Sequence, residues 1–147
     1  MIGYFPAPYP DELFYSLCAR YGDRMGYTTR AALLRDLFGV VVMSTPVLLA
    51  RRLRQFIANL PAGHPYTVEQ LIDRHTLLPF FAPFLPRERV ERLRRHMADR
   101  GHYVKPLDAG IRSQRIRPAK YLMYCPQCVL EDRERFGETY WHRLPQL

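Results

Sequence analysis

The fold is most tightly constrained by a series of short apolar stripes with helical spacing, each bounded by proline or glycine. Leu13, Leu17 and Tyr21 recur every four residues, and Gly26 follows them. Residues spaced in this way share one face of an α-helix, and glycine and proline mark where helices end and begin. With 147 residues, the chain has the length of about one domain. The pattern predicts a mainly α, small multi-helix domain.

The first helix is expected to begin near Pro10, which suits a first turn. Asp11 and Glu12 then complement the positive end of the helix dipole, and Gly26 ends the run. Cys18 lies on or beside the apolar stripe. We therefore interpret Cys18 as a packed core cysteine and not as a ligand.

A second helix is expected to follow, capped by Thr28 or Thr29 and ended by Gly39. The two helices and their short turn form a helix-turn-helix in outline. Arg30 and Arg35 lie off the apolar face of the second helix, where a recognition helix reads a DNA groove. The ordinary interpretation is that any small α domain contains such pairs.

The third helix is expected to start at Pro46 after a cap at Ser44 or Thr45. Its buried stripe is predicted to be Leu49, Leu53, Phe56, Ile57 and Leu60. Its other faces carry Arg51, Arg52 and Arg54. These arginines form either a solvated surface or, with the arginines of the second helix, one basic surface.

The middle of the chain contains a segment with a clear helix signal, followed by an apolar segment that prolines interrupt. Thr67 and Gln70 predict a capping box for a helix from Val68 to about Arg74. The segment 75–86 holds three prolines and is predicted to be irregular, with its phenylalanines packed between helices and His75 as a core or capping residue.

The most regular helix is predicted from Arg87 to Arg100. Its inward residues are expected to be Val90, Leu93 and Met97. Favourable i,i+4 pairs join Glu88 to Arg92 and Glu91 to Arg95, which makes this helix a mostly solvated scaffold.

The charge is strongly positive. There are 22 Lys plus Arg against 14 Asp plus Glu, which gives a net charge of +8 and a pI near 9.8. The excess falls in residues 27–60, 86–101 and 102–124. Arginine-rich surfaces attract polyanions and their guanidinium groups suit phosphates, although a GC-biased genome produces the same composition. Residues 102–120 lack any period and form either a phosphate-tracking loop or a linker; their arginines are Arg112, Arg115 and Arg117.

A cysteine pair follows Tyr121–Tyr124, which is expected to be a short strand. Cys125 and Cys128, separated by a turn that Pro126 stiffens, present two thiolates as half of a structural zinc site. After Cys128 the one further candidate ligand is His142. The alternatives are two simple structural cysteines or a redox pair, and the redox pair lacks its usual βαβ context.

Several functional classes lack their sequence signals. The chain contains no G-x-S-x-G, Walker loop, H-E-x-x-H or G-x-G-x-x-G pattern, so no enzymatic activity is expected. It has no secretory signal and no apolar run of about 18 residues. Three cysteines do not form a disulfide framework. We expect a cytoplasmic bacterial protein.

The extended start, Tyr4–Pro10, is too rich in proline for a helix, so its aromatic side chains are expected to dock on an apolar surface. With the helix that follows, this run makes a block, Phe5–Arg20, that resembles the start of the TniQ family, especially its TnsD-like branch. There an F-P-x-P run precedes an acidic, E-L-containing helix that ends in Ala-Arg. Gln70–Phe84 resembles the middle of such proteins, and Tyr124–Trp141 resembles the start of their zinc finger.

The resemblance implies a non-catalytic adaptor that selects targets for a bacterial transposon. Such proteins bind DNA or an RNA-guided CRISPR effector complex and recruit the transposon's AAA+ ATPase regulator, which is TnsC-like. The family completes its zinc finger with a C-P-x-H pair, so only Cys125 and Cys128 carry over as zinc ligands here. This difference implies that the chain is the N-terminal part of a longer protein.

The resulting interpretation divides the chain into a helical part (1–101), a basic linker (102–120) and half a zinc-finger module (121–147). Nucleic-acid contact is assigned to Arg30, Arg35, Arg51, Arg52, Arg54, Arg112, Arg115 and Arg117. Partner contact is assigned to Tyr4, Phe5, Pro6, Pro8 and Tyr9, and a homodimer is compatible with this picture. The alternatives are a stand-alone helix-turn-helix transcriptional regulator and a fragment of a zinc-dependent hydrolase or nuclease.

Overall fold

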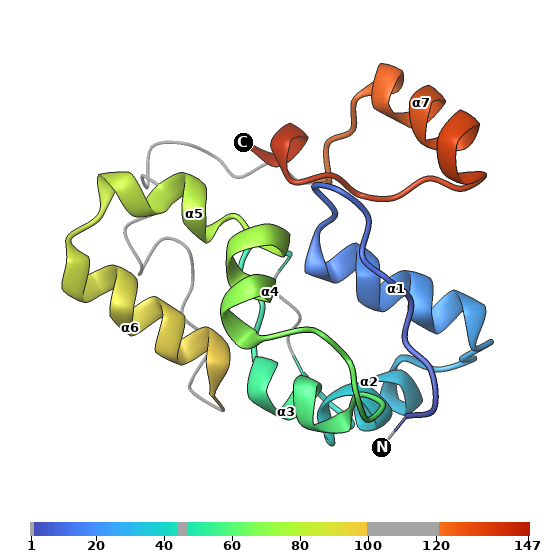
Figure 1. The fold of residues 1–147 in the computed structure, drawn as a ribbon, viewed down its shortest axis with the longest axis horizontal. Helices are drawn as coiled ribbons and strands as arrows, with labels where there is room; N and C mark the ends of the chain where they lie inside the picture. The colour runs from blue at the N-terminus through green and yellow to red at the C-terminus, as the bar shows by residue number, and fades with distance from the viewer. Residues whose placement is uncertain (1, 44–46, 100–120) are drawn as a thin grey trace.

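The structure is a computed structural model that describes residues 2–43, 47–99 and 121–147, and within them it is mainly α (Figure 1). The α-helices are α1 (Phe14–Arg24), α2 (Arg30–Phe38), α3 (Leu53–Asn59), α4 (Val68–His75), α5 (Leu78–Phe81), α6 (Arg87–Ala98) and α7 (Pro126–Phe136). Two 3-10 turns, Ala82–Phe84 and Leu144–Gln146, complete them. None of the described helices is long and apolar enough to cross a lipid bilayer.

The first helix begins later than its sequence indicates. Asp11 takes a left-handed conformation with φ of 57°, and α1 starts only at Phe14. The prediction of a helix from Pro10 was wrong because Glu12 turns inward instead of facing solvent at a first helical turn. Its side chain is fully buried, and its carboxylate accepts hydrogen bonds from the Tyr9 backbone and the Ser16 hydroxyl.

The second helix has the predicted ends. The Thr29 hydroxyl accepts a hydrogen bond from the Ala32 N–H, which satisfies one of the free donors of the first turn. Gly39 ends α2 with φ of 67°, in the left-handed region that glycine adopts at low cost. Leu34, Leu37 and Phe38 are buried, as the apolar stripe indicated.

The third helix is shorter than predicted. Its expected cap and first residue, 44–46, lie outside the described residues, and Val47–Arg52 is not helical. Arg52, with φ of 56°, precedes α3 in a left-handed conformation, and its guanidinium donates to the Phe38 carbonyl. The prediction was wrong because Leu49 and Ala50 are buried in non-helical chain, which the helical spacing of the leucines did not reveal.

The capping box at α4 is confirmed, since the Thr67 hydroxyl and the Gln70 side chain each bond the other's backbone N–H. The segment after it is more ordered than expected, with α5 and a 3-10 turn in place of irregular chain. The prediction that its phenylalanines are buried was wrong for Phe84, which is 84% exposed. Leu77 and Leu78 fill the core there instead.

The last helix of the N-terminal part, α6, buries Leu93 and Met97 as predicted. Its ion pairs differ, because Glu91 pairs with Arg87 at 2.9 Å, one turn before it. Arg94 forms an ion pair with Asp73 on α4. This contact fixes one side of α6 against the rest of the fold.

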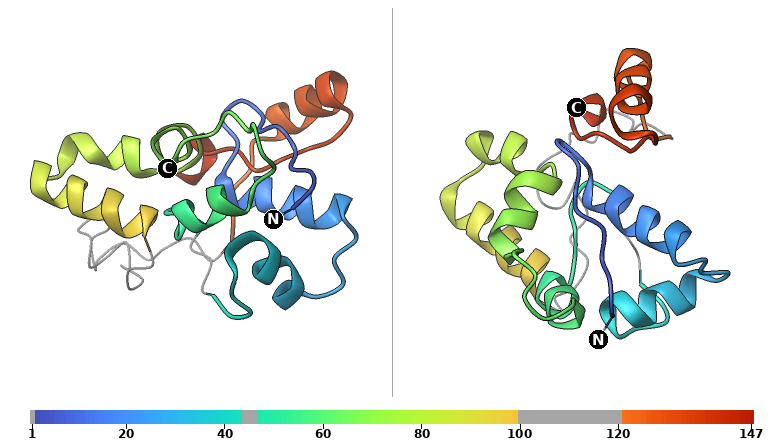
Figure 2. Two further views of the ribbon diagram at one scale, coloured as in Figure 1. Left: turned by 60° about the horizontal axis from the view of Figure 1, so that its bottom comes forward. Right: turned by 45° about the vertical axis from the view of Figure 1, so that its right-hand side comes forward.

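Phe56 is the centre of the core. It is fully buried, and its ring lies 4.9 Å from Phe14, 5.0 Å from Phe5 and 5.8 Å from Phe38. Helices α1, α2 and α3 and the N-terminal arm (residues 2–10) therefore meet at this side chain. The right-hand view in Figure 2 shows the arm running between α1 and α2 on one side and α3 and α4 on the other.

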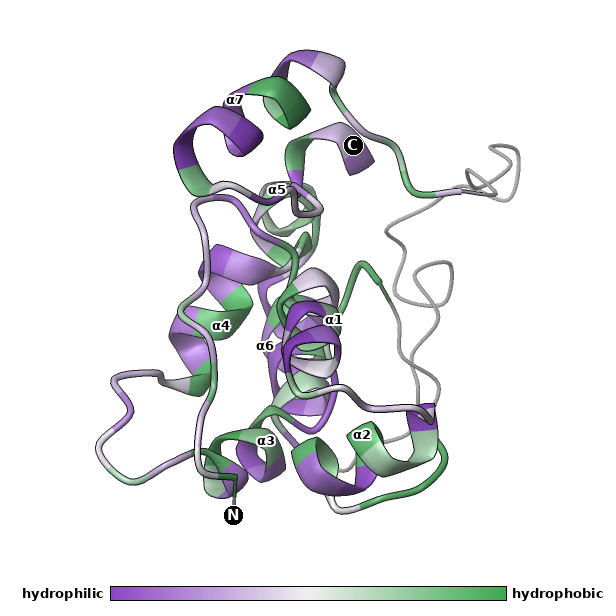
Figure 3. Ribbon diagram, turned by 90° about the vertical axis from the view of Figure 1, so that its right-hand side faces the viewer, coloured by the Kyte–Doolittle hydropathy of each residue, from purple (hydrophilic) through white to green (hydrophobic). Residues whose placement is uncertain are grey.

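The C-terminal segment, residues 121–147, packs against α1 and the arm. The Leu13 N–H donates to the Trp141 carbonyl at 2.8 Å, and Glu12 and His142 form an isolated antiparallel bridge. Residues 121–124 form no ladder among the described residues, so the predicted strand there was wrong. Figure 3 shows α7 as mostly hydrophilic, which fits a helix that packs by one edge.

Candidate nucleic-acid interface and cysteine pair

A buried ion-pair network joins the arm, α1 and the C-terminal segment. Arg20 donates to both oxygens of Glu12, at 2.8 and 3.0 Å, and to Glu138 at 2.9 Å. It also donates to the Ala7 carbonyl, and its guanidinium lies 4.0 Å from the centre of the Tyr9 ring. This guanidinium therefore joins the arm, Glu12 and the C-terminal segment.

The electrostatics of this network favour the charged forms. Burial lowers the pKa of Arg20, but its hydrogen bonds and attraction to Glu12 and Glu138 outweigh burial and raise the pKa overall. The hydrogen bond from Tyr9 and the charges of Arg20 and Arg24 hold the pKa of Glu138 below its usual value. The same hydrogen bond raises the pKa of Tyr9. The cluster is thus a set of matched charges.

A second set of polar contacts holds the chain end. Arg143 donates to the Asp11 carboxylate at 2.9 Å and to the Asp73 carbonyl at 2.8 Å. His142 donates from Nε2 to Asp132 on α7 at 2.9 Å. Asp11 therefore leaves the expected dipole position to cap Arg143 and the following turn.

The histidine and cysteine that sequence reasoning placed in the core are there. His75 donates from Nδ1 to the Glu12 carbonyl at 2.8 Å, and burial lowers its pKa. Cys18 is buried, and desolvation raises the pKa of its thiol far above the usual value. Both act as structural groups.

Cys125 and Cys128 lie at the start of α7. Cys125 is the N-cap residue, and its Sγ accepts from the Cys128 N–H at 3.5 Å. This backbone hydrogen bond lowers the pKa of Cys125, whereas the pKa of Cys128 is raised by its side-chain contact with Cys125. The two sulfur atoms therefore lie on one side of the turn, as half of a zinc site requires.

The rest of a zinc site does not assemble around this pair. Across residues 2–43, 47–99 and 121–147, no three His, Cys, Asp or Glu side chains gather closely enough to hold a metal ion. His142, the further candidate, bonds Asp132 and lies 3.9 Å from Asp11. The pair fits two of the four zinc ligands, and the described residues do not supply the other two.

The predicted nucleic-acid arginines have different settings. Arg30 donates to the Met43 carbonyl and Arg52 to the Phe38 carbonyl, so both also hold the backbone. Arg54 pairs with Asp99 at 2.8 Å while remaining 66% exposed. Arg35 is exposed beside a depression of about 340 Å³ between α1, α2 and the arm. Arg51 is half-buried, and the other three predicted arginines lie outside the described residues: Arg112, Arg115 and Arg117.

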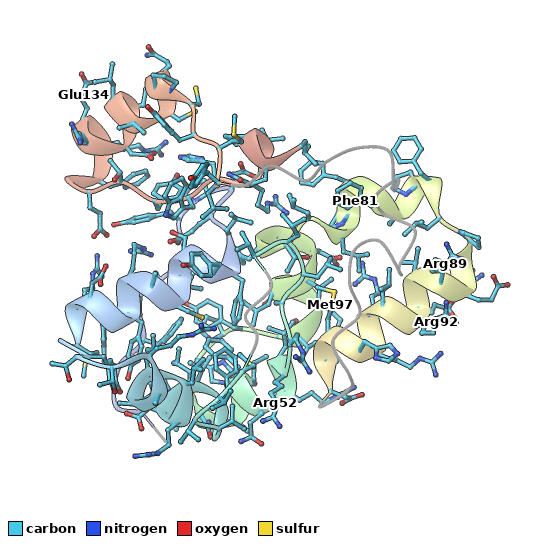
Figure 4. All side chains as sticks on the ribbon, turned by 180° about the vertical axis from the view of Figure 1, so that it is seen from behind. Arg52, Phe81, Arg89, Arg92, Met97 and Glu134 are labelled. Carbon is cyan, nitrogen blue, oxygen red and sulfur yellow. The ribbon has the colours of Figure 1, made fainter. Side chains whose placement is uncertain are left out.

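Sequence reasoning missed the arginines of α6. Arg92 and Arg95 are exposed on α6, a helix that contacts α3. Figure 4, which views the molecule from behind, labels Arg52 near the start of α3 and Arg92 on α6. The sequence contained one signal for an anion-binding role, which was the spacing of three residues between these arginines. It was missed because each arginine was assigned to an i,i+4 ion pair with a glutamate.

The residues assigned to partner contact are divided between surface and core. Tyr4 is 46% exposed, and its hydroxyl accepts from Arg24. Phe5 packs on Tyr21 and Phe56, and Pro6 is buried. The list is completed by Pro8 and Tyr9, which are half-buried.

Comparison with known proteins gives a match along almost the whole chain. A model of the TniQ protein family matches residues 3–147. The chain belongs to the TniQ family. It is also similar to the transposon Tn7 transposition protein TnsD of Escherichia coli, with 34% identity over 146 residues that cover 97% of this chain and 29% of that protein. The chain thus spans less than a third of the length of that relative.

The three sequence blocks that resemble the TniQ family meet in space around Glu12. Glu12 and Arg20 of the first block form the buried ion pair. His75 of the second block donates to the Glu12 carbonyl, and Trp141 of the third accepts from Leu13. These residues of the TniQ-like blocks therefore have a structural role, which is to lock the arm and the C-terminal segment to α1.

Proposed function

We propose that this chain is a target-selection module of a DNA transposition system, which binds target DNA or an RNA-guided targeting complex and recruits an AAA+ ATPase regulator. The observation that carries the proposal is its TniQ-family membership together with its likeness to a Tn7 transposition protein along 97% of its length. The net charge of +8 supports an anionic partner.

We further propose that the module acts without chemistry of its own. Three of its carboxylates form ion pairs within the fold. Arg20 pairs with Glu12 and Glu138, and Arg143 pairs with Asp11. A general base must be free to reach a substrate proton. Groups bound in this way stabilise the structure and are poorly suited to proton transfer.

Contact with nucleic acid is assigned to the exposed arginines of α2 and α3, such as Arg35 and Arg54. The guanidinium of Arg54 remains largely solvent-accessible beside Asp99. A phosphate can therefore replace Asp99, or it can bind the same guanidinium beside Asp99. Residues 102–120 are also proposed to contact nucleic acid, because the segment carries an excess of positive charge.

Contact with a protein partner is assigned to the outer edge of the arm. Tyr4 is the exposed aromatic residue there, while Phe5 and Pro6 anchor the arm in the core. Aromatic side chains held in place in this way lose little entropy on binding, which favours them as contact points.

Zinc is proposed for the cysteine pair, with Cys125 and Cys128 as two of its ligands. The metal would fix the turn before α7 by joining it to another segment. The test is the zinc content of the purified protein beside that of a Cys125→Ser variant. Equal zinc in both proteins contradicts the proposal.

The proposed function is tested by fluorescence anisotropy with labelled duplex DNA at increasing salt. An adaptor module is expected to bind weakly and with strong salt dependence. Tight binding to one palindromic site by the chain alone indicates a helix-turn-helix regulator instead. Cleavage or hydrolysis that a single side-chain substitution abolishes indicates the hydrolase or nuclease class.

A further inference from the structure

Two neighbouring depressions on the surface between α3 and α6 share one residue, Asp99. One depression, of about 340 Å³, is lined by Arg92, Arg95, His96 and Asp99. The other, of about 440 Å³, is lined by Arg52, Arg54, Gln55, Ala58, Ala98 and Asp99. Because Asp99 lines both, the two depressions lie beside each other on this surface. We call the two together the α3–α6 basic groove, and its cations are Arg52, Arg54, Arg92 and Arg95.

The groove has an excess of positive charge. Its carboxylate, Asp99, is paired with Arg54 at 2.8 Å. Glu88 lies one helical turn before Arg92, yet it forms no ion pair with it in the described part of the chain. Arg92 and Arg95 are likewise without a carboxylate partner among the described residues. Within the described ranges, both exposed guanidinium groups are therefore available to an anion.

The α6 arginines of the groove stand on a rigid helix. Arg92 and Arg95 are three residues apart, which is a rise of about 4.5 Å along the helix axis. The helix is fixed from behind by Leu93 and Met97, which are 2% and 3% exposed. Two guanidinium groups held in this way can each contact a phosphate of one backbone.

We propose that the α3–α6 basic groove binds the phosphodiester backbone of a nucleic-acid duplex. This inference rests on the proposed function and adds α6 to it, with Arg92 and Arg95 as direct phosphate contacts beside Arg52 and Arg54. Phosphate contacts position a protein on a duplex but carry no sequence information. The groove therefore sets position and affinity, and target choice comes from elsewhere.

The test compares two double variants that remove the same charge from different places. Arg92→Gln with Arg95→Gln removes two groove contacts, and Arg133→Gln with Arg135→Gln removes two exposed arginines of α7 as the matched control. Anisotropy is measured over a series of salt concentrations, with a labelled DNA duplex and with an RNA duplex of the same sequence. Thermal unfolding of each variant checks that it remains folded.

The expected result is a fall in the salt slope for the groove variant alone. Each lost contact with B-DNA reduces the slope of log K against log salt by about 0.9, so two contacts reduce it by about 1.8. The slope for the control variant is expected to differ from the wild-type slope by less than about 0.45, which is half the change for one contact. The DNA and RNA arms identify which duplex supplies the phosphates.

Two results overturn this inference while leaving the proposed function in place. The first is an unchanged slope for Arg92→Gln with Arg95→Gln, when the wild-type chain binds duplex. The second is an equal fall for the α7 control, which shows that net charge matters and the groove does not. A wild-type chain that binds neither duplex at low salt contradicts direct DNA binding in the proposed function, and this inference with it.

Discussion

Replacing Arg20 by methionine is predicted to destabilise the fold more than any exposed arginine substitution. The change removes the two hydrogen bonds to Glu12, at 2.8 and 3.0 Å, and leaves that carboxylate fully buried without a cation. Among the described residues, the Tyr9 N–H and the Ser16 hydroxyl remain as its donors. Removing one partner of a buried ion pair costs about 3–5 kcal/mol.

The expected loss is near the upper part of that range, because Arg20 also holds Glu138 and the Ala7 carbonyl. Native proteins of this size are stable by roughly 5–15 kcal/mol, so the variant is expected near the margin of folding. At about 2–4 °C per kcal/mol, a loss of about 4–5 kcal/mol lowers the melting temperature by roughly 8–20 °C.

The assay is urea unfolding followed by two signals. Far-UV circular dichroism reports the helices, and the fluorescence of Trp141, the single tryptophan, reports the contact between the C-terminal segment and Leu13. The double variant Glu12→Gln with Arg20→Met is expected to recover part of the loss, since no buried charge is left unpaired. A loss below about 1 kcal/mol for Arg20→Met, or a double variant less stable than it, refutes the reasoning.

Three further predictions concern acid stability, capping and packing. The pKa of Glu138 is lowered in the folded state, so its contribution to stability is present above its ordinary pKa of 4.5 and is lost as pH falls through the folded value; Glu138→Gln should flatten that part of the acid unfolding curve, and an unchanged curve contradicts the assignment. Thr67→Ala should cost about 1 kcal/mol in urea unfolding, since it removes the capping box of α4; no measurable loss argues against the cap. Phe56→Ala should cost about 3–5 kcal/mol because it opens a cavity among three rings; a cost near 1 kcal/mol shows that the core collapses around it.

Local signals in the sequence predicted the helices whose ends are set by neighbouring residues. Thr29, Thr67 and Gln70 cap through contacts three residues away, so the sequence contains the whole motif. The apolar spacing likewise predicted that Leu37 and Leu93 are buried. Contacts of this range depend on helix geometry alone.

The parts that were missed depend on residues far apart in the chain. From the sequence, Glu12 was predicted to be an acid in the first turn of a helix. In the structure it is buried against Arg20 and the chain end near His142. Asp11 is drawn to Arg143, more than one hundred residues later. The late start of α3 goes with the burial of Leu49 in non-helical chain, which a periodic pattern does not distinguish from a helix.

The candidate nucleic-acid surface shows the same division. The sequence identified the arginines of α3 because they form a run. The arginines of α6 were assigned to ion pairs with glutamate that the structure arranges differently, with Glu91 joined to Arg87. The contact between α3 and α6 places the two sets around neighbouring depressions that share Asp99.

Recruitment to DNA is the most direct test of the central claim, which is that this chain joins a nucleic acid to a transposition ATPase without breaking bonds. The measurement is the amount of the transposon's AAA+ ATPase regulator retained on immobilised target DNA, with and without the chain and with its Tyr4→Ala variant. The account predicts that the wild-type chain raises retention, that Tyr4→Ala lowers the gain and that the DNA stays intact. Equal retention with and without the chain, or DNA cut by the chain alone, contradicts it.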